Sequence, residues 1–438
     1  MDRVILSLAG PAVVENLLLT FVSFTDTIMV GWLRSSAALA AVAMGGFINL
    51  MLSQLFVSLV VAATSLIARH WGARDFSKAR AYLGQALFLA FLVGFLVAFL
   101  GFILAPVILK VMGLGGEALK MGTFYFRLLV MINVLAFPGL TLFGALRGSG
   151  DTRTPMLING ASNLLHILLA LLLIFGWGIF PALGVAGAGW ATAISTSLGG
   201  LAVLFFAYKS RGEFFFRFSL LKPQRELLHD LISLASPAFW EALIFRGAQI
   251  VFMRFVSALG EIPLAAHQVA MSIESLSYMP GFGFAVASTT LSGQFVGAKR
   301  IEVAERSVLR TLKVGLSILS AFGIFFLAFG DKVALLFGGT PEVLSQAGLA
   351  IRIGGLEQPG LAIFMILSGA LRGAGDTRSP MIATLFGVFL ARLLTVYLLA
   401  FLLGFGLAGV WIGTALDWSL RAGITYYFFK RGSWKRSS

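Results

Sequence analysis

A stretch of thirteen residues occurs twice in this chain of 438 residues, and it constrains the fold more than any other feature of the sequence. The first copy, at residues 144–156, reads GALRGSGDTRTPM, and the second, at residues 369–381, reads GALRGAGDTRSPM. The copies begin 369 − 144 = 225 residues apart, which is about half the chain. A repeat of this length at this spacing predicts two related halves that each present the turn once.

Each copy is typical of a compact turn between two helices. Its three glycines permit a sharp backbone path between the apolar runs on either side. Thr154 before Pro155, and Ser379 before Pro380, predict an N-cap residue followed by proline at the first helical position. The turn is either a simple helix connection or a rigid corner about which the two halves rock.

Composition decides the class of protein. Hydrophobic residues make up 58% of the chain and charged residues 12%, about half the charged fraction of a soluble protein. Apolar runs of about 20 residues are long enough to cross a bilayer, so we expect an all-α membrane protein with twelve transmembrane helices. The expected spans lie near residues 9–32, 42–67, 85–109, 124–144, 157–179, 184–207, 232–258, 264–290, 311–337, 349–370, 381–404 and 407–429.

The loops predict how the chain is divided and oriented. Six spans in each half keep both halves in the same orientation, which gives two pseudo-symmetric six-helix lobes related by a parallel repeat. We expect an N-terminal lobe at residues 1–208, a cytoplasmic linker at 209–230 and a C-terminal lobe at 231–438. Lysine and arginine gather in alternate loops, so the positive-inside rule places both termini in the cytoplasm of a multi-pass protein of the cell membrane.

Several classes of function are disfavoured. The net charge of +14 follows the loops, so we expect no nucleic acid partner. The chain has no cysteine, its four histidines lack the spacing of metal ligands, and we expect neither a metal site nor a cofactor. No GxxxxGK[ST] loop indicates ATP hydrolysis. No metal-binding acid cluster and no exposed nucleophile with a base is evident, so we do not expect an enzyme.

Ionisable residues inside the spans are the strongest functional candidates, because a charge in the bilayer is costly unless it meets a partner or water. Asp26 lies about fifteen residues into the first span, and Glu15, eleven residues earlier, shares its face about 16 Å away. Glu241, Glu274 and Glu357 lie in apolar sequence of the second half. For each of these acids the alternative to a functional role is a structural one, in which hydrogen bonds from neighbouring side chains satisfy the carboxyl group.

Other side chains of the second half add partners and aromatic surfaces. Asp417 and Arg421, four residues apart, predict a structural ion pair on one helix. His267 faces the same way as Glu274, seven residues later. Most of the 41 phenylalanines should face lipid or pack. Aromatic residues of either half that line a cleft could bind flat or cationic molecules by stacking and cation–π contacts. The candidates are Phe137, Tyr278, Phe282 and Phe284.

Four segments carry a resemblance to a known family. These are the paired GALRGxGDTR[ST]PM turns, DTIMVG at residues 26–31, AAHQVAMSIESLSYMPGFGFAVA at 265–287 and GVWIGTALDW at 409–418. Together they resemble the multidrug and toxic compound extrusion (MATE) family of the NorM/DinF type over essentially the whole chain. The resemblance implies two six-helix lobes, alternating access and export of mainly cationic organic compounds in exchange for H⁺ or Na⁺.

The resemblance also assigns roles. Asp26 matches the coupling carboxylate of the family's first helix, Glu241 the acid of helix seven, and Glu357 falls near the acid of helix ten. His166 and Ala170 stand where the family has an asparagine and an aspartate in helix five. This departure removes oxygen ligands of a hard cation and favours H⁺ over Na⁺. In helix five, His166 would hydrogen-bond Asp26.

The sequence therefore predicts a proton-favoured antiporter that exports amphipathic cations, with organic cations, H⁺ or Na⁺ and the lipid bilayer as partners of a monomer. The alternative is a flippase for lipid-linked intermediates, which would need a cleft rich in Arg and Lys. The candidate ion-coupling residues are Asp26, His166, Thr192, Glu241, Glu274 and Glu357. The candidate substrate-binding residues are Glu15, Phe137, His267, Tyr278 and Phe282.

Overall fold

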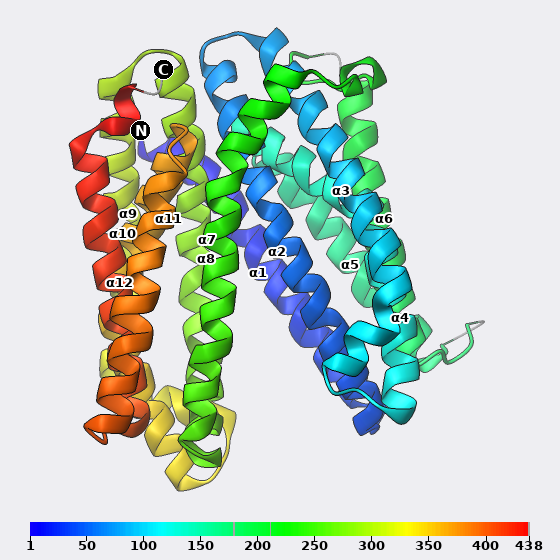
Figure 1. Ribbon diagram of the computed structural model, residues 1–438, viewed down its shortest axis with the longest axis vertical. Coiled ribbons are helices and arrows are strands. Elements are labelled where there is room, and N and C mark those ends of the chain that lie inside the picture. Colours follow the sequence, from blue (N-terminus) through cyan, green and yellow to red (C-terminus); the bar gives the residue numbers. More distant parts are fainter. Residues whose placement is uncertain (178–179, 211, 437–438) are drawn as a thin grey trace. The chain divides into compact units, whose positions relative to one another are not determined.

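The computed structural model describes residues 1–177, 180–210 and 212–436, in which all the regular structure is helical (Figure 1). The long helices are α1 Asp2–Gly31, α2 Ser36–Gly72, α3 Phe76–Val111, α4 Gly116–Ser149, α5 Arg153–Phe175, α6 Val185–Lys209, α7 Arg225–Ala258, α8 Glu261–Gly297, α9 Ile301–Ala334, α10 Pro341–Gly373, α11 Arg378–Phe386 and α12 Gly406–Arg431. Helix α11 continues as π-helical turns over Gly387–Leu394 and Tyr397–Leu402. The prediction of an all-α membrane protein with twelve helical spans is confirmed.

The helices match the expected spans and extend beyond most of them. Within the described residues, ten helical segments are long and apolar enough to cross a bilayer. Helices α8 and α12 are not among them, although both are long enough. Glu274 in α8, and Asp417 and Arg421 in α12, are buried ionisable residues of the kind that lower a helix's mean hydropathy. The predicted fifth span ended at residue 179, which lies outside the described residues, and α5 ends at Phe175.

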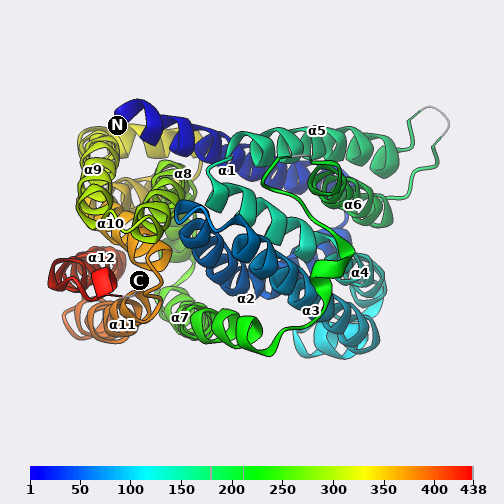
Figure 2. The same cartoon turned by 90° about the horizontal axis from the view of Figure 1, so that it is seen from above.

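The chain forms two compact units. The N unit comprises Val14–Trp71 and Asp75–Ile232, and the C unit comprises Met1–Val13, Gly72–Arg74 and Ser233–Ser438. Within the N unit, α4 packs against α3 and α6. Within the C unit, α10 packs against α8, α9 and α12 (Figure 2). The fourth helix of each half is therefore central to its unit, as the duplication implies.

The first thirteen residues differ from the predicted division, which assigned residues 1–208 to one lobe. The first turns of α1 pack in the C unit because Ile5 and Leu8 are buried there in one hydrophobic cluster with Phe284. Asp2 also accepts two hydrogen bonds from Arg310, each 2.6 Å long. Helix α1 therefore contributes residues to both units.

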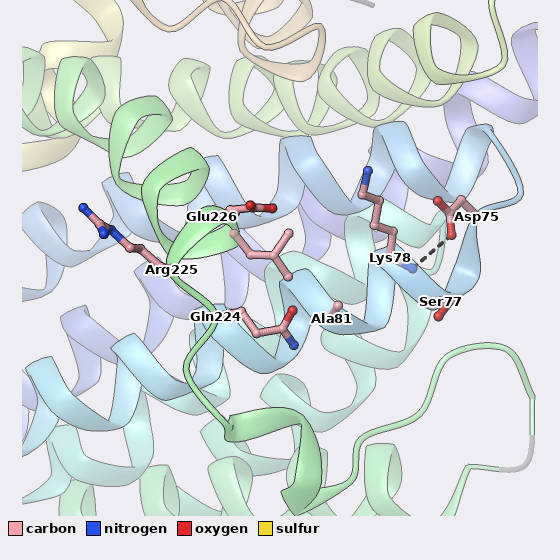
Figure 3. Close-up of a pocket in the computed structure, with 8 residues that line it drawn as sticks. Asp75, Ser77, Lys78, Ala81, Gln224, Arg225 and Glu226 are labelled. Carbon is pink, nitrogen blue, oxygen red and sulfur yellow. Dashed lines mark hydrogen bonds between the residues drawn. The ribbon is translucent and has the colours of Figure 1, made fainter.

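Residues 209–230, expected as a linker between lobes, fold as part of the N unit. Gln85 Nε2 of α3 donates to the carbonyl oxygens of Leu220 and Lys222 at 3.2 and 2.8 Å, and Tyr82 Oη donates to Asp230 Oδ2 at 2.7 Å. Figure 3 shows the surface pocket of about 560 Å³ that remains between the start of α3 and the start of α7. This segment is an attached part of the unit rather than a free tether.

The repeated turn has the same structure in both halves, but its cap differs from the predicted one. Thr154 and Ser379 were predicted as N-caps, and both instead lie inside helices that begin one residue earlier. The capping side chains are Asp151, whose Oδ1 accepts from the Thr154 N–H at 2.9 Å, and Asp376, whose Oδ1 accepts from the Ser379 N–H at 2.9 Å. An aspartate three residues upstream satisfies the free N–H groups of each helix start.

Glycines in the turn allow the helices to approach closely. A Cβ atom at Gly148 would lie 2.8 Å from the carbonyl oxygen of Thr64, and one at Gly373 would lie 2.2 Å from that of Thr289. The two contacts are equivalent, because Thr64 and Thr289 are also 225 residues apart. The repeated turn is thus fixed against the second helix of its own half.

Candidate functional site

The sharpest sequence candidate, Asp26, meets His166 inside the N unit. His166 Nε2 on α5 lies 2.6 Å from Asp26 Oδ1 on α1, and the side chains are 6% and 30% exposed. The predicted contact between these two residues is therefore confirmed. A short contact between a carboxyl group and an imidazole needs a proton between the two atoms.

A residue that the sequence did not single out, Ser195 of α6, lies beside the other ring nitrogen of His166. Its hydroxyl donates to the carbonyl oxygen of Ala191 at 2.7 Å and lies 3.4 Å from His166 Nδ1. Thr192, predicted here, instead donates to the carbonyl oxygen of Ala188. Ser195 lies one turn further along α6.

Glu15 is held by two partners in the N unit. Arg147 Nη2, from the repeated turn, donates to Glu15 Oε1 at 2.5 Å, and Asn159 Nδ2 of α5 donates to the same oxygen. The Glu15 side chain is 3% exposed. We call Glu15, Arg147 and Asn159 the N-unit triad. In this arrangement Glu15, a candidate substrate ligand, is already neutralised by a guanidinium.

Glu241 makes the equivalent contacts in the C unit. Arg372 Nη2 donates to its two oxygens at 2.7 and 2.8 Å, and Thr384 Oγ1 donates to Oε1 at 2.9 Å. Glu241, Arg372 and Thr384, the C-unit triad, are 226, 225 and 225 residues from their N-unit counterparts. Both arginines could be singled out from the sequence, because each lies in the repeated turn. Their pairing with Glu15 and Glu241 could not be predicted from it.

A buried charge cluster lies between α11 and α12 in the C unit. Asp417 accepts from Arg421 Nε at 2.5 Å, as predicted, and also contacts Arg392 Nε at 2.7 Å. All three side chains are at most 6% exposed. Gly387 permits this packing, because a Cβ there would lie 2.3 Å from Asp417 Oδ1. Arg392, Asp417 and Arg421 form the C-unit charge cluster.

Two further acids of the C unit face this cluster. Glu274 and Glu357 interact through their side chains, and Tyr278 Oη donates to Glu274 Oε1 at 3.3 Å. Arg392 interacts with both acids. Two guanidiniums thus face three carboxyl groups, and a single proton shared by Glu274 and Glu357 makes the set neutral, as burial requires.

The remaining candidates lie in packed or exposed positions. Phe137 is fully buried, with its ring stacked 4.0 Å from Phe56, and offers no surface to a ligand in this structure. His267 is buried with its ring centroid 5.6 Å from that of Phe252. Phe282 is 46% exposed. Among the described residues, no three His, Asp or Glu side chains gather as metal ligands.

Comparison with a family model reproduces the duplication. The model described as MatE matches the chain twice, over residues 11–172 and 237–398. The two matches begin 237 − 11 = 226 residues apart, the same offset that separates Glu15 from Glu241. Both triads and the Asp26–His166 pair lie inside the matched residues.

Individual proteins are similar over nearly the full chain. A probable multidrug resistance protein NorM of Thermotoga maritima is 31% identical, covering 99% of this chain and 93% of that protein. The multidrug resistance protein MdtK of Yersinia pestis is 31% identical over 94% of this chain and 91% of its own. A crystal structure of a MATE protein in complex with MaD3S superposes with a TM-score of 0.91 at 25% identity, covering 98% of this chain and 95% of that one.

Proposed function

The chain belongs to the MatE family of membrane transporters, and we propose that it exports amphipathic organic cations from the cell in exchange for protons. The Asp26–His166 contact of 2.6 Å carries this proposal. Two relatives named for multidrug resistance support drugs as the exported compounds. We place this multi-pass protein in the cell membrane as a monomer, with cytoplasmic termini, and we expect it to expose its substrate site alternately to the two sides.

The arrangement of hydrogen bonds supports a proton as the coupling ion. The Asp26–His166 contact holds together only while a proton lies between the carboxyl group and Nε2. Loss of that proton leaves two lone pairs facing each other at 2.6 Å. The contact between α1 and α5 then separates or the imidazole reorients, so a protonation step becomes a change in helix packing.

The same loss creates a negative charge suited to a cationic substrate. Ionised Asp26, released from His166, is a 30% exposed carboxylate in an apolar helix. A cation bound near it and the shared proton exclude each other, which is the requirement for antiport. A tenfold change in substrate affinity needs only about 1.4 kcal/mol of difference between the two states.

Sodium is the less favoured coupling ion on chemical grounds. A hard cation needs several oxygen ligands. The partner of Asp26 here is an imidazole nitrogen. The nearby Ser195 hydroxyl lies beside the other ring nitrogen and already donates to the backbone. Such a set fits a proton better than a metal ion.

The test is efflux of ethidium, a flat organic cation, from proteoliposomes with an imposed pH gradient. Asp26→Asn should abolish gradient-driven efflux while insertion and thermal stability are retained, because the amide cannot exchange the proton. His166→Ala should shift the pH dependence without abolishing transport. Glu213→Gln, at an exposed acid of the same unit, is the control and should behave as wild type. Wild-type efflux and pH profile in Asp26→Asn would exclude this site as the coupling site.

A further inference from the structure

The duplication allows each polar contact of one unit to be compared with its counterpart in the other. In the N unit, α5 reaches α1 at two levels, through Asn159 to Glu15 and through His166 to Asp26. Asn159 and His166 are seven residues apart, two turns on one face of α5. In the C unit the first level is repeated, since Thr384 of α11 donates to Glu241 of α7.

The second level differs between the units. At the offset of 226 that relates Glu15 to Glu241, the counterpart of Asp26 is Phe252. At the offset of 225 that relates Asn159 to Thr384, the counterpart of His166 would be Ala391. The π-helical segment Gly387–Leu394 begins after Thr384 and includes this position. A wider turn takes up one extra residue, which brings Arg392 to the place of His166.

The contacts of Arg392 agree with this correspondence. Its guanidinium lies over the Phe252 ring, 5.4 Å from the centroid, and Nη1 donates to Gln249 Oε1 of α7 at 3.3 Å. Arg392 thus reaches the first helix of its half as His166 does. Its carboxylate partner is Asp417 of α12, 2.7 Å from Nε, rather than a residue of α7. The imidazole–carboxyl pair of the N unit is replaced by a guanidinium–carboxylate pair.

We propose that Arg392 is the fixed-charge counterpart of His166. A guanidinium does not release its proton in a protein, so the ion pair between Arg392 of α11 and Asp417 of α12 keeps its charge at every stage of transport. The contact between α1 and α5 closes only when protonated. At this level of the helices the C unit therefore stays in the paired state that the N unit reaches on protonation, and the proton-driven change at this level takes place in the N unit. This inference rests on the proposed function and adds which unit moves.

The surrounding charged groups support this asymmetry. Asp26 and His166 are faced by one further titratable group, Tyr125 of α4, among the described interactions. Arg392 is surrounded by a set that one shared proton makes neutral, and its titratable or charged members are Asp417, Arg421, Glu274, Glu357, Tyr278 and His267. The guanidinium is thus compensated on several sides, whereas the imidazole has one carboxyl partner.

The first experiment fixes the charge in the N unit. We measure thermal stability and ethidium binding against pH for purified protein. In the wild type both should change with pH, because the Asp26–His166 contact requires a shared proton. His166→Arg, which keeps a charged partner for Asp26 at every pH, should abolish that change and hold stability at its low-pH level. A pH dependence that survives in His166→Arg would overturn the proposal.

The second experiment makes position 392 of the C unit titratable in an Asp26→Asn/His166→Gln background, where neither residue of the N-unit pair can titrate. Adding Arg392→His should create a step in which stability falls as pH rises, because the His–Asp417 pair is charged only while the histidine is protonated. Arg392→Gln, whose side chain is never charged, should be less stable than the parent by the same amount at every pH. Absence of the step in folded Arg392→His overturns the inference, as does a pH step in the Asp26→Asn/His166→Gln parent itself. Both stability measurements are independent of transport. Failure of the proposed function would instead appear as wild-type efflux in Asp26→Asn, so the two failures can be told apart.

Discussion

Removing the Arg372 side chain should destabilise the C unit, because it leaves the carboxylate of Glu241 buried without its counter-charge. The Glu241 side chain is 10% exposed and Arg372 supplies two of its three hydrogen bonds, at 2.7 and 2.8 Å. Breaking a buried ion pair by removing one partner costs about 3–5 kcal/mol. The remaining hydrogen bond from Thr384 is neutral and contributes only about 0.5–1.5 kcal/mol. Since Arg372 is 25% exposed, we expect the lower end, about 3 kcal/mol.

The assay is denaturant-induced unfolding of Arg372→Ala in mixed micelles, compared with Arg378→Ala. Arg378 lies in the same turn but is exposed, so its loss should change the unfolding free energy by less than about 0.5 kcal/mol. Arg147→Ala and Arg153→Ala form the matched pair in the N unit. Equal losses for Arg372→Ala and Arg378→Ala would refute the argument that the C-unit triad is a stabilising contact.

Three further predictions concern packing, charge and topology. Gly373→Ala should lower the unfolding free energy by about 1–3 kcal/mol, because its Cβ would overlap the α8 backbone. Gly247→Ala, inside α7 with nothing within 4 Å, should not lower it in the same measurement, because alanine favours the helix over glycine. Asp417→Asn should cost about 3–5 kcal/mol in that assay, since two buried guanidiniums lose their carboxylate. Reporter fusions should give cytoplasmic signals after residues 149 and 217 and external signals after residues 34 and 332, and one reversed loop would break the twelve-span topology.

Much of the fold could be predicted because it depends on local pattern. Apolar runs fix the number of spans, and the repeated turn fixes the relation between halves. The contact between Asp26 and His166 could also be predicted, because a carboxylate in an apolar helix needs a polar partner. The Asp417–Arg421 pair followed from spacing on one helix.

The features that sequence did not predict depend on tertiary contacts. Docking of residues 1–13 in the C unit rests on burial against α8, which no local pattern reports. Two residue types that favour N-caps, Asp and Thr, lie three apart in the turn, and only the structure shows that Asp151 accepts the hydrogen bond. Arg392 could not be matched with His166 because the π-helical segment shifts the register by one residue.

The central claim is that proton exchange at the Asp26–His166 pair drives transport. Its most direct test is ethidium efflux from proteoliposomes that contain the wild-type protein, with a pH gradient or a Na⁺ gradient imposed one at a time. We predict that the pH gradient alone drives efflux and that the Na⁺ gradient alone does not. Efflux driven by Na⁺ at equal pH on both sides would contradict the account and move the coupling site to other carboxylates.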